Sequence, residues 1–191
     1  MEKMRHIAFD CYGLFAAPRV EAFFDDHFGS HSKEMKDRFC VPGDSGQISY
    51  DEFLDQLSAY MGMPKQQIAD EISSKEIVNT DMIELLKEVR KHHHAYLLSN
   101  CMEGALEHTF AGYEIFPYFE KQYRSYALKM VKPNADIFLA VLDDNHIEGK
   151  ELIFFDDNPK NVEAARNVGI EAYVFVDVPS CRKILKEIGI L

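Results

Sequence analysis

Carboxylates that could hold a metal ion stand at the ends of apolar segments in this 191-residue chain. Asp10 follows one such segment, and Asp156 and Asp157 follow another. If these acids meet at one edge of a sheet, they need a cation in order to remain ionised together. Hard oxygen ligands in small number suit Mg²⁺, so the sequence predicts a magnesium site. Gly13, shortly after Asp10, lets the backbone approach a ligand closely.

Other polar residues in comparable positions predict a site for a phosphoryl group. Ser99 and Asn100 end a third apolar segment and offer a hydroxyl and an amide. Lys132 precedes Pro133, where we expect a helix to begin, and a helix N-terminus disfavours a lysine unless an anion is bound nearby. We therefore expect Ser99, Lys132 and Mg²⁺ to neutralise a phosphoryl group that Asp10 attacks, which forms an aspartyl-phosphate.

The order of these residues is more specific than any one of them. Asp-Asp also occurs at 25–26 and 143–144, where a solvated helix surface explains it, and most serines at strand ends only satisfy nearby backbone. The chain shows, in order, an apolar run with Asp, a helical segment, an apolar run with Ser-Asn, a Lys-Pro helix start and an apolar run with Asp-Asp. A single shared site explains this order better than separate structural roles do.

The apolar segments themselves predict the fold. Short, continuously apolar runs are typical of strands that are buried on both faces of a parallel sheet. Four such runs are His6–Phe9, Ala95–Leu98, Leu152–Phe155 and Ala172–Val176, and a weaker, mixed run lies near Tyr123–Tyr126. Helical patterns begin after Pro133 and Asn158. The alternation predicts a doubly wound, mostly parallel, Rossmann-like α/β sheet.

Residues 16–77 break this alternation because they look helical throughout. Ser49 and Glu52 are spaced as a capping box ahead of an apolar helical pattern. We therefore expect a core domain of residues 1–15 and 78–191, with a small helical cap domain of residues 16–77 inserted after the first strand.

Other start and stop signals place the remaining helices of this region. Pro18 is the expected start of a helix that ends near Gly29, and Pro64 begins another short helix. Thr80–Arg90 is predicted to be the helix that returns to the sheet, with its apolar stripe facing the strands. The histidines at 92–94 are predicted to be a basic helix end, because adjacent helical residues do not share one face for a metal.

Amino-acid composition makes some classes of binding partner and cellular location less favourable for this chain. Asp+Glu 32 against Lys+Arg 21 gives a net charge of −11, which disfavours nucleic acid and anionic membrane surfaces. The 47% apolar fraction is ordinary for a globular protein, and no apolar run approaches the ~20 residues of a membrane span. The N-terminus lacks a signal-peptide pattern and the four cysteines lack metal or disulfide spacing, so we expect reduced thiols and a cytoplasmic location. The oligomeric state is left open.

The segments FDCYGLF, LLSN, VKPNADIF and FFDDNPKNVEAARNVGI resemble the four ordered motifs of the haloacid dehalogenase superfamily, over essentially the whole chain. The helical insert matches the position of that superfamily's cap. The short length, GQIS-x-x-EF, LSN and FFDDN are similar to small sugar-phosphate phosphatases that act on glucose 1-phosphate. The resemblance therefore implies a hydrolase that removes phosphate from a small phosphorylated metabolite, with Mg²⁺ as cofactor.

The resemblance also implies a role for each matching residue. Asp10 would be the nucleophile, with Ser99 and Lys132 as the other catalytic residues. The implied metal ligands are Asp10, the Tyr12 carbonyl, Asp156 and, directly or in an outer shell, Asp157. The implied phosphate and substrate contacts are Ser99, Asn100, Lys132, Tyr12 and Gly13.

Tyr12 is the one difference from the superfamily's motifs that affects the chemistry. Most phosphatases of the superfamily carry a second aspartate two residues after the nucleophile, which serves as general acid and base. A phenol with an ordinary pKa of about 10 activates water poorly at neutral pH, and losing such a catalyst costs on the order of 10²–10⁴-fold in rate.

Three functions remain open after this departure. The first and preferred one is a phosphatase whose leaving group needs little protonation; the glucose 1-phosphate subgroup itself tends to lack the second acid. The second is a 2-haloacid dehalogenase, whose enzymes carry Asp-x-Tyr-Gly, although the paired acids in FFDDN argue against it. The third is a protein that binds Mg²⁺ and a phosphate ligand without turnover.

Overall fold

The computed structural model of the chain describes residues 4–17, 19–74 and 77–191. Within these residues the sheet has five strands, all parallel, in the order β3-β2-β1-β4-β5. The strands are β1 (His6–Phe9), β2 (His94–Ser99), β3 (Lys121–Arg124), β4 (Leu152–Asp156) and β5 (Glu171–Val174). The prediction of a doubly wound parallel α/β fold is confirmed.

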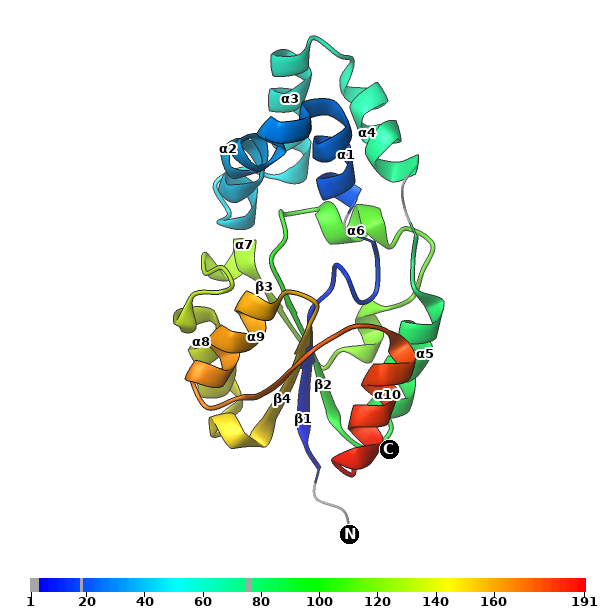
Figure 1. Ribbon diagram of the computed structural model, residues 1–191, viewed down its shortest axis with the longest axis vertical. Helices are drawn as coiled ribbons and strands as arrows, with labels where there is room; N and C mark the ends of the chain where they lie inside the picture. The colour runs from blue at the N-terminus through cyan, green and yellow to red at the C-terminus, as the bar shows by residue number, and fades with distance from the viewer. Residues whose placement is uncertain (1–3, 18, 75–76) are drawn as a thin grey trace.

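Ten α-helices in the described ranges connect and cover these strands (Figure 1). They are α1 (Arg19–Phe28), α2 (Ser32–Asp44), α3 (Tyr50–Met61), α4 (Lys65–Ser74), α5 (Thr80–Arg90), α6 (Ala105–Thr109), α7 (Ser125–Leu128), α8 (Ala135–Asn145), α9 (Pro159–Asn167) and α10 (Val178–Glu187). A search of the described helices finds none with the length and apolarity to cross a membrane.

Helices cover both faces of the sheet, with α5 and α10 on one side and α8 and α9 on the other (Figure 1). Phe9 and Phe155 point into the layer beneath α5 and α10, whereas Ala8 and Phe154 point into the layer beneath α8 and α9. Successive strand residues face opposite sides, so both sets are buried. This double burial is the reason why the strands read as continuous apolar runs rather than as alternating patterns.

Helices α1 to α4 form a separate group, here called the four-helix cluster, beyond the carboxyl ends of the strands (Figure 1). Its apolar core includes Phe24, Phe53 and Leu57, which are almost completely buried. Ser49 and Glu52 make both bonds of the predicted capping box at the start of α3. The predicted start of the first helix, Pro18, lies outside the described residues.

Several element boundaries differ from the prediction, and the largest shifts involve β5, β3 and α8. The fourth apolar run, expected at Ala172–Val176, forms β5 at Glu171–Val174, because the chain then leaves the sheet for α10, which is capped by Asp177. The run near Tyr123–Tyr126 is β3 at Lys121–Arg124, and Ser125 already begins α7. Helix α8 begins at Ala135, after a turn that contains Pro133, and not at Pro133 itself.

The turn after β1 brings two distant segments into close contact. Gly13 has a φ of +86°, which side chains with a Cβ rarely adopt, and its amide donates to the Ala16 carbonyl at 2.8 Å. A Cβ on Gly13 would lie 2.2 Å from Oδ2 of Asp157. Only glycine therefore allows the turn to pack against this carboxylate.

We expect Gly13→Ala to lower the free energy of unfolding by more than Gly169→Ala does. Both positions have a φ of +86°, so both substitutions carry a backbone cost of about 1–3 kcal/mol. Gly169 has open space around its Cβ position, whereas Gly13 would also clash with Asp157, which adds roughly 1–3 kcal/mol. Urea unfolding of both variants measures the difference, and equal losses would show that the close contact is absent.

Candidate active site

A buried lysine joins the ends of three strands at the centre of the site. The Lys132 Nζ lies 2.7 Å from Oδ1 of Asp10 and 2.7 Å from Oδ2 of Asp156. It also donates to the Leu98 carbonyl oxygen at 2.9 Å. The lysine side chain is 1% exposed, so these contacts are made away from water. Lys132 thus neutralises part of the negative charge of the carboxylates at the ends of β1 and β4.

The surrounding charges are not balanced by this one cation. Burial raises the pKa of Asp10 to about 7, although Lys132 opposes the shift. Burial would lower the pKa of Lys132, but Asp10 and Asp156 together raise it, so the ammonium stays charged. Burial and the neighbouring Asp156 raise the pKa of Asp157. One ammonium against three carboxylates leaves a site that attracts a further cation.

The three predicted metal-binding acids are close enough to share an ion. Asp10, Asp156 and Asp157 each offer one carboxylate oxygen, and these oxygens all lie within 4.8 Å of one another. Asn161 orients Asp156 by donating to both of its carboxylate oxygens, at 3.1 and 2.9 Å. The backbone amide of Asn158 donates to Oδ1 of Asp156 at 2.8 Å. Such fixed oxygen ligands from two strand ends suit a hard divalent cation.

Asn100 fixes the loop that carries Lys132. Its side-chain amide donates to the Lys132 carbonyl at 2.9 Å, and its Oδ1 accepts from the Lys132 amide at 2.9 Å. Ser99 is fully buried, and its hydroxyl donates to the Asn100 carbonyl at 3.3 Å. Asn100 and Lys132 line the cavity described below, whereas Ser99 does not.

The phenol of Tyr12 is engaged away from the acids. Its hydroxyl lies 3.2 Å from Oγ1 of Thr109 on α6, and Arg19 on α1 donates to the same oxygen. Burial raises the pKa of Tyr12 well above its ordinary value. The phenol therefore stays neutral. Through Thr109 it links the turn after β1 to Arg19 of the four-helix cluster.

A cavity of about 360 Å³ lies between the strand ends and the four-helix cluster. Asp10, Lys132 and Asp157 line its sheet side. The remaining polar lining comes from the turn after β1, the four-helix cluster, the β2 loop, α6 and α9, and consists of Tyr12, Arg19, Glu21, Asp44, Tyr50, Asn100, Thr109, Asn158 and Asn161. Cavities of this size, roughly 300–1,000 Å³, hold small molecules.

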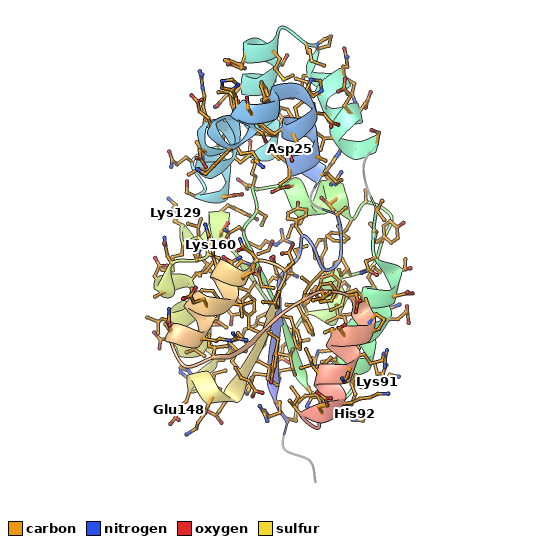
Figure 2. The ribbon with its side chains drawn as sticks, in the orientation of Figure 1. Asp25, Lys91, His92, Lys129, Glu148 and Lys160 are labelled. Carbon is orange, nitrogen blue, oxygen red and sulfur yellow. The ribbon has the colours of Figure 1, made fainter. Side chains whose placement is uncertain are left out.

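The sequence analysis did not identify several of these residues. Asn161 had a usable signal, because it stands in the first turn of the predicted helix after Asp156 and faces back toward the strand end. Asp44, Tyr50 and Thr109 had none, since they reach the cavity from elements far apart in the chain. The histidines of 92–94 do not line the cavity, and Figure 2 shows His92 at the end of the molecule away from the four-helix cluster.

Comparisons with known proteins find similarity to one family of hydrolases. A family model described as haloacid dehalogenase-like hydrolase matches residues 4–169. A D-ribitol-5-phosphate phosphatase of Bacteroides thetaiotaomicron is 29% identical over 141 residues, which cover 68% of this chain and 68% of the relative.

Two solved structures are similar over most of the chain. One is a haloacid dehalogenase family enzyme from Bacteroides thetaiotaomicron in complex with magnesium and inorganic phosphate, with a TM-score of 0.76, 28% identity, and coverage of 90% of this chain and 94% of that one. The other is a predicted hydrolase of the same superfamily from Porphyromonas gingivalis, with a TM-score of 0.77, 25% identity, and coverage of 97% and 99%. The family model spans most of the chain and these structures share its fold, so this protein belongs to the haloacid dehalogenase-like hydrolase family.

Proposed function

We propose that this chain is a magnesium-dependent phosphatase of small sugar or polyol phosphates that forms an aspartyl-phosphate on Asp10. The observation that carries the proposal is the contact of Lys132 with both Asp10 and Asp156 at the floor of a small cavity. A buried cation beside a carboxylate nucleophile is suited to a substrate that brings its own negative charge. The phosphatase relative and the neighbour with bound magnesium and phosphate support the same chemistry.

The donor set fits magnesium. Asp10, Asp156 and Asp157 supply hard oxygen atoms within 4.8 Å of one another, and burial raises the pKa of Asp10 and Asp157. These acids, with the Tyr12 carbonyl, would hold the ion. When bound, Mg²⁺ would supply positive charge to the phosphoryl oxygens and let the carboxylates remain ionised.

The residues of the chain account for the first chemical step. Oδ1 of Asp10 accepts from the Cys11 amide at 2.7 Å and contacts Lys132, which leaves Oδ2 to attack phosphorus. Lys132 and Asn100 hold the phosphoryl oxygens, joined by the Ser99 hydroxyl if it turns away from the Asn100 carbonyl. The bond from phosphorus to the substrate oxygen breaks as the bond to Asp10 forms. Water then cleaves the acyl-phosphate and releases inorganic phosphate.

The four-helix cluster would serve as the cap that selects the substrate. We infer that residues 16–77 act as one cap domain over a core of residues 1–15 and 78–191. Arg19 and Tyr50 of this cluster, with Thr109 of α6, supply polar groups to the cavity that Lys132 also lines, which suits the hydroxyl groups of a sugar or polyol. Glucose 1-phosphate is one candidate, and D-ribitol 5-phosphate is another because a relative acts on it.

A panel of phosphate esters tests the reaction. We expect phosphate release from sugar and polyol phosphates with Mg²⁺, and its loss when EDTA removes the ion. Asp10→Asn should lower the turnover number by on the order of 10⁴-fold or more, because the covalent route is closed. Glucose 1-phosphate and D-ribitol 5-phosphate belong in the panel, with released phosphate as the measurement.

Two results would contradict this proposal. Metal-independent halide release from 2-chloropropionate would indicate a dehalogenase. Tight binding of Mg²⁺ and inorganic phosphate without turnover of any ester would indicate a binding protein.

Lys132→Met should lower both activity and stability. The substitution leaves Asp10 and Asp156 without their buried cation, and breaking such a pair costs about 3–5 kcal/mol. Lys33→Met is the matched control, because Lys33 pairs with Asp37 on an exposed surface and its loss should change stability by less than about 0.5 kcal/mol. Urea unfolding without added metal compares the two, and equal stabilities would refute the charge-balancing role of Lys132.

A further inference from the structure

The segment that carries Asp44 is packed tightly against the core. A Cβ on Gly43 would lie 2.4 Å from the Met102 side chain, and a Cβ on Gly46 would lie 2.2 Å from the Tyr126 carbonyl oxygen. The end of α2 can approach the core this closely because both positions are glycine. Asp44 is therefore held at the boundary between the four-helix cluster and the strand ends.

Hydrogen bonds connect the Asp44 backbone to Cys101, in the loop after β2. The Ser125 hydroxyl donates to the Asp44 carbonyl at 2.6 Å and accepts from the Cys101 amide at 3.0 Å. Cys101 directly follows Asn100, whose side chain fixes Lys132. The Asp44 backbone is thus tied to Lys132 through a short chain of buried and partly buried hydrogen bonds.

Asp44 lines the same cavity as Asp10 and Lys132. Burial and the carboxylate of Glu21 on α1 raise the pKa of Asp44 to about 7, while Lys132 opposes the shift. The cysteines at 40 and 101 also face it, and burial raises the pKa of both thiols, so they are neutral near pH 7. An acid in this environment exchanges a proton near neutral pH.

The proposed reaction needs such a group. An alkoxide leaves phosphorus poorly without a proton, and water attacks the acyl-phosphate faster when a base removes its proton. The Tyr12 phenol is held by Thr109, and Asp10, Asp156 and Asp157 are committed to the nucleophile and metal roles. Asp44, like Glu21, is a cavity carboxyl outside that set, and its backbone hydrogen bond with Ser125 ties it to the loop next to Lys132.

We propose that Asp44 is the general acid and base of this phosphatase, an inference that rests on the proposed function. As Asp10 forms its bond to phosphorus, the Asp44 carboxyl gives its proton to the leaving oxygen, which departs as an alcohol. The Asp44 carboxylate then takes a proton from water as the water oxygen attacks phosphorus. The acyl-phosphate bond breaks, Asp10 returns as a carboxylate, and phosphate leaves as HPO₄²⁻, with Asp44 protonated again.

Substrates with different leaving groups distinguish a general acid and base role of Asp44 from a structural one. 4-Nitrophenolate leaves without a proton, so Asp44→Asn should still release about one equivalent of it in a burst, at a rate within about threefold of wild type. The following steady state should be slower by about 10²–10⁴-fold, because the base is missing. With the sugar or polyol phosphate that wild type hydrolyses fastest, the single-turnover rate itself should fall by a similar factor.

Controls and opposite outcomes complete the test. Asp37→Asn, on the exposed side of the same helix, should leave both substrates unaffected, and Asp44→Glu should recover part of the alkyl phosphate rate. The nitrophenolate burst also shows that Asp44→Asn is folded. Equal losses in the burst and in alkyl phosphate turnover, or no loss in either, would overturn the inference. A wild-type protein that hydrolyses neither ester would instead overturn the proposed function itself.

The pH dependence supplies a second readout. In wild type the single-turnover rate with an alkyl phosphate should fall as the pH rises through about 7, because Asp44 loses the proton it must donate. The Glu21 carboxylate raises the pKa of Asp44 in wild type. Glu21→Gln removes this charge and lowers the pKa of Asp44, so the fall should move to lower pH. Asp44→Asn should abolish the fall, and a variant that keeps it would refute the assignment.

Discussion

The contact of one buried ammonium with two buried carboxylates is the interaction on which the site depends. Lys132 can lie between Asp10 and Asp156 only because β1 and β4 are neighbours that end at the same level, with the Leu98 carbonyl of β2 as the third partner. Removing ions from water costs several kcal/mol each, and the Coulomb attraction repays that cost only where geometry and hydrogen bonds are good. The Cys11 amide and Asn161 provide those bonds, so the sheet and the charge cluster stabilise one another.

The charge balance of this cluster limits which ligands the site can bind. A protein with a net charge of −11 repels anions over most of its surface, and three carboxylates at the site add to that repulsion. In the proposed phosphatase, a phosphate dianion would bind only after a divalent cation joins Lys132, so metal and phosphate binding should be coupled. In this proposed scheme an apo site does not bind phosphate, because its own acids compete for the lysine.

The sequence predicts the sheet side of the site much better than the side formed by the four-helix cluster. Buried parallel strands have a strong apolar pattern, and the polar residues that follow Phe9 and Phe155 mark the edge where ligands bind. The environment of Lys132 differs from the one that the sequence predicts: α8 begins three residues later, and two carboxylates rather than a helix end hold the ammonium. The capping box before α3 was readable, whereas Asp44 depends on packing against Met102 and Tyr126, which no local pattern reveals.

The identity of residue 12 affects which side chain of the site can transfer protons. An aspartate at this position would add a fourth carboxylate to a cluster whose charge already exceeds that of Lys132. The phenol instead bonds with Thr109, which also accepts from Arg19, and so connects the turn after β1 to both α6 and α1. In the proposed mechanism, Asp44, which lines the same cavity, carries out the proton transfer instead of residue 12. Because α2 carries Asp44 and belongs to the four-helix cluster, proton transfer then depends on how that cluster sits on the core.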